Sequence, residues 1–493
     1  MSRGTSAALS GFAAVAALVL LTVSCGGDRN EPGGPHHEAK PAMGPPPRDG
    51  APADRPNFLV IDIDSLRSDR VRASRGGEPL APTLAALADR GAHFPNLISQ
   101  GAWTIPAIGA LLTGMDPTLP RVGADGRSSL VGGRPQLPKI LEMYGYQTAG
   151  FWGDSAPAGF GEVVDLFQVR GVATQGEPWV YRERITSWLA ADAREPFFAF
   201  VHEMDVYDPR PALPSAELHR HVEARDDCTA PRRNPEQALH ALIPTLGLPA
   251  AAEHLIAHYD GAVSYYDGVV AAILEQLSAS GLAERTVVMV LSDHGNDLLE
   301  HGAMGHGTTY DSVIRVPLIV VDPRLEGGGR ELDTRIQTVD IAPTILDRAG
   351  IPAAHGMTGV SLLPLLGFGE GSYEERPAFS LSSAAEGSIR DGRHKLMQGR
   401  YRRDDRPGEI PAGEPIGEPI TQLFDLIDDP GETRDLLDEQ PDVAARLGER
   451  LDSWLATRAA GAEARPKIEI EPELKEKLQE DGYWELVAPG GDH

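Results

Sequence analysis

The chain has 493 residues, a formal net charge of −27 and two cysteines. Such acidity argues against nucleic-acid binding, which needs a basic surface that releases counterions from phosphates. Two cysteines, one of them in the N-terminal segment, exclude a disulfide framework within the mature chain, and Cys228 lies in a polar stretch typical of an inert thiol. The length is enough for two or three domains of ~150 residues each.

Residues 1–25 resemble a bacterial export signal. The apolar run at residues 11–23 is shorter than the ~20 residues that cross a bilayer. It leads into Leu-Thr-Val-Ser-Cys, which is similar to a lipoprotein box and ends at Cys25. We therefore expect export and a lipid anchor on Cys25, at the periplasmic or extracellular side of a bacterial membrane. Because Thr22 is atypical in such a box, cleavage without lipidation is the alternative.

The composition divides the rest of the chain into four parts. Residues 26–56 are rich in proline and glycine and have hardly any large apolar residue, which predicts a disordered tether. Residues 57–370 are predicted to form the main domain and residues 371–462 a smaller C-terminal subdomain. Residues 463–493 are left as a tail with one short charged helix.

Short apolar runs alternate with helical patterns from residue 57 onward. The predicted strands are residues 58–64, 196–201, 286–291 and 316–321, and the predicted helices include residues 82–91, 259–277 and 342–349. Strands that alternate with helices indicate an α/β fold with a largely parallel sheet covered on both faces.

Ligands of such sheets collect beyond the carboxyl ends of the strands. The polar residues at these ends are Asp62, Asp64, His202, Asp205, Asp293 and His294. We expect the functional site there.

One segment points to a family. Residues 102–114 read Ala-Trp-Thr-Ile-Pro-Ala-Ile-Gly-Ala-Leu-Leu-Thr-Gly. This resembles the nucleophile segment of the sulfatases, in the alkaline phosphatase superfamily, where Cys (or Ser)-x-Pro-x-Arg precedes a small-residue helix and Leu-Leu-Thr-Gly. Thr104 stands at the position of the cysteine that matures to formylglycine, and Ile108 stands at the position of the arginine.

Further motifs follow in the order of the same family. They are Asp-Ser-Leu-Arg-Ser-Asp at residues 64–69, Ser-Asp-His-Gly at 292–295, Glu-His-Gly-Ala-Met-Gly-His-Gly at 300–307, Ile-Arg-Val-Pro at 314–317 and Val-Asp-Ile-Ala-Pro-Thr at 339–344. The resemblance covers roughly residues 57–440. It implies an alkaline-phosphatase-like sandwich with a large, mostly parallel sheet flanked by helices, and a C-terminal subdomain with a short antiparallel sheet.

The resemblance also implies a metal site with the ligands Asp64, Asp293 and His294, joined by Thr104. Two carboxylates, an imidazole and a hydroxyl suit one divalent cation, which would lower the pKa of the hydroxyl and make Thr104 a nucleophile. The choice between Ca²⁺, Mg²⁺, Mn²⁺ and Zn²⁺ stays open. Asp62 shares a strand face with Asp64, so it is either a further ligand or a carboxylate that hydrogen-bonds beside the site.

Three residues are candidate substrate contacts. His306 corresponds to a lysine or histidine that contacts the substrate anion or leaving group, and a surface histidine is the alternative. His202 is a weaker candidate, and Tyr207 stands where a substrate-contacting histidine is usual. Glu300 ranks with His202, His301 is weaker still, and Trp103 is expected to pack rather than to bind.

A threonine nucleophile favours phosphorus over sulfur. A sulfated formylglycine hydrate can eliminate sulfate, whereas a sulfated threonine has no such exit; threonine is similar to the nucleophile of phosphodiesterases. We expect an exported hydrolase of a sulfate- or phosphate-type ester, preferably a phosphodiester or phosphonate ester. Its substrate is a small molecule or a glycan or lipid ester, shaped by loops at residues 115–135 and 207–250. The alternatives are a phosphoryl-linked group transferase and a non-catalytic anion- or glycan-binding lipoprotein.

Overall fold

The computed structural model describes eleven stretches of the chain. They are residues 55–117, 121–122, 128–129, 134–153, 161–172, 179–203, 235–302, 304–368, 371–383, 386–399 and 420–463. The predicted signal segment, residues 26–54 of the predicted tether and the predicted C-terminal tail helix lie outside these residues, as do Cys25, Asp205, Tyr207 and Cys228. Within the described stretches, no helix combines the length and the apolar character that crossing a bilayer demands.

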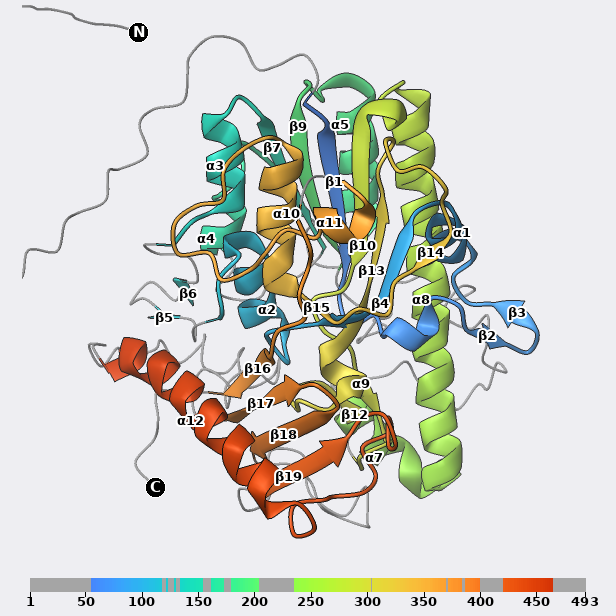
Figure 1. The fold of residues 1–493 in the computed structure, drawn as a ribbon. Helices are drawn as coiled ribbons and strands as arrows, with labels where there is room; N and C mark the ends of the chain where they lie inside the picture. Colours follow the sequence, from blue (N-terminus) through green and yellow to red (C-terminus); the bar gives the residue numbers. More distant parts are fainter. Residues whose placement is uncertain are drawn as a thin grey trace, which may run out of the picture. The chain divides into compact units, whose positions relative to one another are not determined.

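A nine-stranded sheet forms the centre of the main domain (Figure 1). Its strands lie in the order β14 (Arg330–Glu331), β4 (Ala92–Ile98), β13 (Arg315–Val321), β10 (Thr286–Leu291), β1 (Asn57–Ile63), β9 (Phe197–Glu203), β7 (Gln147–Trp152) and β8 (Val169–Val172), and β15 (Ile336–Gln337) also pairs with β4. The four strands predicted from apolar runs are β1, β9, β10 and β13, so the α/β prediction is confirmed.

Strand β13 runs antiparallel to both of its neighbours, β10 and β4, whereas the other described pairs of this sheet are parallel. After β10 the chain stays at the carboxyl edge of the sheet, where it forms the β11–β12 hairpin (Asp297–Leu298 and Met304–Gly305) and the helical turn α9 (Asp311–Ile314). Strand β13 therefore starts at that edge and must run back. The sheet is mostly parallel, as predicted, with this one reversal.

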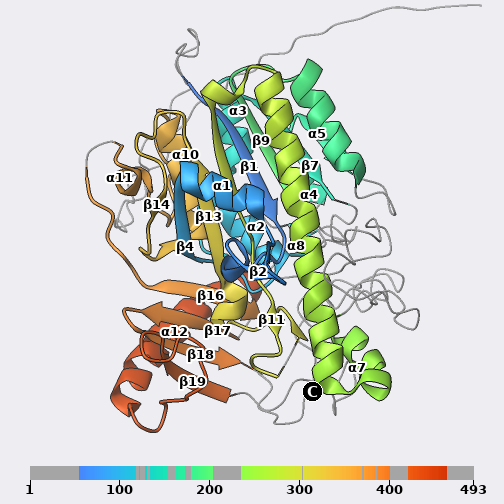
Figure 2. The same ribbon diagram turned by 90° about the vertical axis from the view of Figure 1, so that its right-hand side faces the viewer.

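Helices cover both faces of the sheet (Figures 1 and 2). One face packs against α2 (Thr104–Thr113), α3 (Leu137–Met143), α4 (Gly161–Val164), α10 (Ile341–Arg348) and α11 (Leu363–Leu366); the other packs against α1 (Pro82–Arg90), α5 (Trp179–Ala191) and α8 (Leu248–Ala279). Alternate residues of β1 serve the two cores: Phe58 and Val60 face α2, and Leu59 and Ile61 face α8. The predicted helix at residues 259–277 is thus the later part of α8. Helix α7 (Pro235–Leu246) and the start of α8 occupy residues that were predicted to be a loop.

Short elements complete the main domain. They are η1 (Ser68–Arg70), β2 (Ser74–Arg75), β3 (Glu78–Pro79), β5 (Arg121–Val122), β6 (Ser128–Ser129), η2 (Ala283–Arg285) and η3 (Thr338–Asp340).

The C-terminal subdomain is a four-stranded antiparallel sheet with one helix across it. Strands β16 (Ala378–Ser383), β17 (Glu386–Asp391), β18 (His394–Gly399) and β19 (Ile420–Asp425) pair in sequence order, and α12 (Pro441–Glu463) packs on them. Strand β16 also bonds to the segment ahead of α2, because Ala102 N donates to Leu381 O (2.9 Å) and Leu381 N donates to Gln100 O (2.8 Å). The C-terminal sheet therefore directly supports the residues ahead of Thr104.

Candidate active site and metal centre

The first carboxylate of the site follows β1 in a tight turn. Ser65, next to Asp64, has a φ of 64°, and its Oγ donates to Asp64 Oδ1 (2.8 Å). The turn is held by Tyr259 of α8, whose hydroxyl donates to Ser65 O (2.8 Å) and accepts from Arg67 N (3.1 Å). These contacts fix the direction of the Asp64 carboxylate before any ligand binds.

The second part of the site follows β10. Asp293 Oδ1 accepts from the backbone N–H of His294 (2.8 Å), and His294 Nδ1 lies 3.0 Å from Gly295 O. Because a carbonyl can only accept, Nδ1 carries a proton, which leaves Nε2 as the nitrogen that can bind a metal. That Nε2 lies 3.5 Å from Asp64 Oδ1 and 3.6 Å from Asp293 Oδ2. His294 is therefore held in the tautomer that binds a metal.

Thr104 is the first residue of α2, and its Oγ1 lies 3.2 Å from His294 Nε2. The hydroxyl thus faces the same point as the two carboxylates and sits at the positive end of a helix, which favours its anionic form. Ile108, one turn later, is fully buried in the core on this face of the sheet. The position that carries an arginine in the sulfatase segment therefore supplies no charge here.

The ligand atoms of Asp64, Asp293 and His294 lie within 4.8 Å of one another in a buried group. Burial, together with the charge of Asp293, raises the pKa of Asp64 to about 6. Burial would lower the pKa of His294, but Asp293 and Asp64 raise it above its ordinary value. Buried like charges of this kind are costly without a cation between them, so the residues present fit a divalent metal.

His306 lies at the edge of this group. It is half-buried, and its ring centroid is 4.6 Å from that of His294. The glycines on both sides have positive φ values, 127° at Gly305 and 102° at Gly307, and Gly307 N donates to Ala102 O (2.9 Å). Burial and the neighbouring His294 lower the pKa of His306 well below its ordinary value. The hairpin thus places a neutral imidazole beside His294.

Asp62 and His202 form a buried pair behind the first group. His202 Nδ1 lies 2.7 Å from Asp62 Oδ2, both side chains are fully buried, and the His202 ring packs 5.6 Å from that of Trp152. Asp62, His202 and Asp293 make a second set of possible ligands within 4.8 Å of one another. Trp103 is buried and donates from Nε1 to Ser382 O (3.2 Å), which is the packing role predicted for it.

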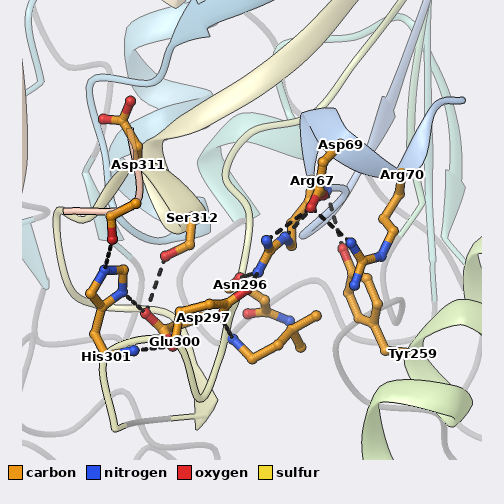
Figure 3. A network of polar contacts seen from close by, with 12 residues as sticks. Arg67, Asp69, Arg70, Tyr259, Asn296, Asp297, Glu300, His301, Asp311 and Ser312 are labelled. Carbon is orange, nitrogen blue, oxygen red and sulfur yellow. Dashed lines mark hydrogen bonds and ion pairs between the residues drawn. The ribbon is translucent and has the colours of Figure 1, made fainter. Parts of the chain in front are cut away.

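A polar network joins the residues after β1 to those of the β11–β12 hairpin (Figure 3). Arg67 donates to Glu300 Oε1 (2.6 Å) and to Asn296 O (2.9 Å). The ring of His301 bonds to Asp297 through Nδ1 and lies 3.1 Å from Gly431 O through Nε2. Glu300 and His301 therefore both make contacts within the protein.

Residues 56–351 match the family model described as Sulfatase. The chain belongs to the sulfatase family. Members of this family are ester hydrolases and generally bind a divalent metal, which agrees with the group of Asp64, Asp293 and His294.

Several named sulfatases are similar in sequence to this sulfatase-family chain. It is 30% identical over 188 residues to arylsulfatase K of Danio rerio, a match that covers 38% of the chain and only 34% of that relative. It is 24% identical over 492 residues to the Delta 4,5-hexuronate-2-O-sulfatase of Bacteroides thetaiotaomicron, covering 89% of the chain and 96% of the relative.

Solved structures share the fold. The phosphonate monoester hydrolase of Agrobacterium radiobacter superposes with a TM-score of 0.60 at 22% identity, covering 82% of this sulfatase-family chain and 96% of that protein. BT1596, a 2-O GAG sulfatase, also gives a TM-score of 0.60, at 20% identity, with coverages of 85% and 96%. At these identities the likeness establishes the alkaline-phosphatase-like architecture.

Proposed function

We propose that the protein is a metal-dependent ester hydrolase in which Thr104 is the nucleophile. The observation that carries this proposal is the position of Thr104 Oγ1, 3.2 Å from the metal-binding nitrogen of His294 and at the first turn of α2. The hydroxyl occupies the place where the family keeps its nucleophile. Buried carboxylates on two neighbouring strand ends complete the arrangement.

Asp64, Asp293 and His294, with Thr104, would hold one divalent cation. Such an ion would supply positive charge that lowers the pKa of the threonine hydroxyl and polarises the ester. The carboxylates suit Ca²⁺ or Mg²⁺, and the imidazole moves the preference toward Mn²⁺ or Zn²⁺.

The reaction has two steps. Thr104 Oγ attacks phosphorus, the new O–P bond forms, and the bond from phosphorus to the leaving alcohol breaks. The hydroxyl proton of Thr104 goes to solvent, and the leaving oxygen takes a proton from solvent as it departs, while the N–H of His306 stabilises that oxygen by a hydrogen bond. Water then attacks phosphorus in line, the bond to Thr104 breaks, and the water's proton returns to the threonine oxygen. The acid product and the free hydroxyl are restored.

A phosphodiester or phosphonate ester is the substrate class that this site favours. A monoanion suits a site whose carboxylates outnumber its cations, whereas a dianionic phosphomonoester would be repelled. The structural relatives include a phosphonate monoester hydrolase. A second candidate, a sulfate ester of a glycan, is supported by the named hexuronate sulfatase, which matches 89% of the chain.

The test measures hydrolysis of bis-nitrophenyl phosphate, a nitrophenyl phosphonate and nitrophenyl sulfate, with Mn²⁺, Zn²⁺ or Ca²⁺ added to metal-free protein. We expect metal-dependent turnover, fastest with the phosphorus esters, and a loss of at least about 10³-fold in kcat for Thr104→Ala. Thr113→Ala is the matched control, because Thr113 lies at the far end of the same helix, where its hydroxyl donates to Gly109 O (2.7 Å) and accepts from Met115 N (3.3 Å).

Three outcomes separate the alternatives. Full activity in Thr104→Ala would remove the nucleophile proposal. Faster release of nitrophenol with an added sugar acceptor, and transfer of the group to that sugar, would indicate a transferase. Binding of the esters without turnover of any of them would indicate a binding protein.

We also propose export and a lipid anchor at Cys25, which rest on the sequence of residues 1–25 alone. The anchor would be the protein's single attachment to a membrane. Expression of the full chain in a bacterium fed an alkyne fatty acid should label the wild type and leave Cys25→Ala unlabelled and released by washing. A wild type without label would contradict lipidation.

A further inference from the structure

A second group of buried ligands lies beside the proposed metal site. Asp62 is one pleat deeper on β1 than Asp64 and points to the same face of the sheet, toward α2. It pairs in register with His202 of β9, and the ligand atoms of Asp62, His202 and Asp293 lie within 4.8 Å of one another. Asp293 belongs to both groups.

Two oxygens of this second group have no hydrogen-bond donor. Among the residues that the structure describes, neither Asp62 Oδ1 nor Asp293 Oδ2 accepts a hydrogen bond, and both side chains are fully buried. A buried carboxylate oxygen left unsatisfied costs free energy unless a cation or another donor approaches it. Both oxygens belong to carboxylates of this second group, Asp62 and Asp293.

The balance of charges at the site also favours a second cation. Asp62, Asp64 and Asp293 bring three carboxylates into a buried volume, and one divalent cation leaves one negative charge before the threonine anion or an anionic substrate is added. Ile108 contributes no charge where the sulfatase segment has an arginine. A second divalent cation would give the substrate-free site a net positive charge, which favours both the threonine anion and an anionic substrate.

We propose that Asp62, His202 and Asp293 bind a second divalent cation, next to the one held by Asp64, Asp293 and His294 and sharing Asp293 with it. An imidazole with two carboxylates suits Mn²⁺ or Zn²⁺. Binding converts the Asp62–His202 hydrogen bond into a pair of metal ligands, and the proton on His202 Nδ1 is released to solvent or moves to the other ring nitrogen.

The proposal rests on the proposed metal dependence only through the shared Asp293, and its test counts ions rather than turnover. Protein stripped with a chelator is dialysed against saturating Mn²⁺, and bound manganese is counted per chain by mass spectrometry. We expect two ions per wild-type chain, one in Asp62→Asn, one in His202→Gln and none in Asp293→Asn. Electron paramagnetic resonance of the wild type should show coupling between the two ions, because they share a carboxylate.

His301→Gln is the matched control, since His301 is also a histidine bonded to an aspartate but lies outside both groups, and it should keep two ions. Asp62→Asn preserves the size of the side chain, and circular dichroism verifies that each variant is folded. One ion in the wild type, or two in Asp62→Asn, would overturn the proposal and leave Asp62 and His202 as a buried hydrogen-bonded pair. A wild type that binds ions but hydrolyses no ester would instead count against the proposed function.

Discussion

His301 is surrounded by groups that hold its ring as a cation. Nδ1 bonds to the Asp297 carboxylate and Nε2 faces Gly431 O at 3.1 Å, so both nitrogens meet groups that can only accept (Figure 3). The ring also stacks on Tyr310, with centroids 3.6 Å apart and planes 2° from parallel. Burial opposes the charge, but Asp297 and Glu432 raise the pKa of His301 above its ordinary value.

This histidine makes stability depend on pH. Because the folded protein holds the proton more tightly than the unfolded chain, the stabilisation is complete below the unfolded pKa of about 6.5 and is lost as pH rises through the higher folded value. We expect His301→Gln to lower the free energy of unfolding by roughly 1–3 kcal/mol at pH 5.5 and by less at pH 9. Urea unfolding of both proteins at several pH values measures the difference; a difference that does not change with pH would contradict the cationic state.

Local sequence motifs point to the residues that cluster at the candidate site more directly than to the residues that orient them. Thr104, Asp293 and His294 come from local motifs, and the structure brings them together. Ser65 and Tyr259 were missed, because the bond from Tyr259 to Ser65 O joins residues 194 positions apart and no local pattern encodes it. A tyrosine on an amphipathic helix is expected simply to pack in the core. Here the ring of Tyr259 packs in the core, and its hydroxyl supports the turn after β1.

At the scale of elements, the apolar runs predicted where the strands lie but not the direction of β13. An apolar run has no polarity, so the alternation of strands and helices favoured a parallel neighbour for β10. The reversal depends on the connection between β10 and β13, which holds the β11–β12 hairpin and α9 at the carboxyl edge instead of a crossover helix. Parallel neighbours need such a crossover.

Gly295 determines how closely the end of β10 approaches α9. A Cβ at this position would lie 2.4 Å from Ser312 O, and Gly295 N donates to Val313 O (2.6 Å). We expect Gly295→Ala to push Asp293 and His294 out of position, to weaken metal binding by about 10–100-fold and to cost about 1–3 kcal/mol of stability.

Gly268→Ala is the control for this change. Gly268 lies on α8 with nothing within 4 Å of an added Cβ, so alanine there should leave metal binding unchanged and stabilise the helix by roughly 0.5–1 kcal/mol. Metal titration of the two variants measures the change in metal affinity, and thermal unfolding measures the change in stability. Wild-type metal affinity in Gly295→Ala would show that the close approach is unimportant for the site.

At the scale of the whole described unit, Lys395 connects the C-terminal subdomain to the main domain. It is fully buried on β18, where Nζ lies 2.9 Å from Asp311 Oδ1 of α9 and 2.6 Å from Glu432 Oε1. Arg390 of β17 reaches the same aspartate at 3.0 Å. Acidic and basic groups from both sides of the boundary therefore share one buried cluster.

Removal of this lysine should destabilise the protein strongly. Lys395→Met leaves two buried carboxylates without their central cation, and breaking a buried pair in this way costs about 3–5 kcal/mol. Lys139→Met, which removes an exposed partner of Glu142, should change stability by less than about 1 kcal/mol. Guanidinium unfolding monitored by circular dichroism compares the two; equal effects would mean that the cluster adds little to the contact between the domains.

The bonds between β16 and the residues ahead of Thr104 also determine when the candidate site can form. Ser380 Oγ donates to Ser99 O across 281 positions of the sequence, next to the backbone bonds between Leu381 and the residues ahead of Thr104. At ~5–20 residues per second of synthesis, roughly 15–60 s pass between the appearance of these two segments on the ribosome. The nascent chain thus carries its threonine without the strand that fixes it, and a competent site is among the last features to mature.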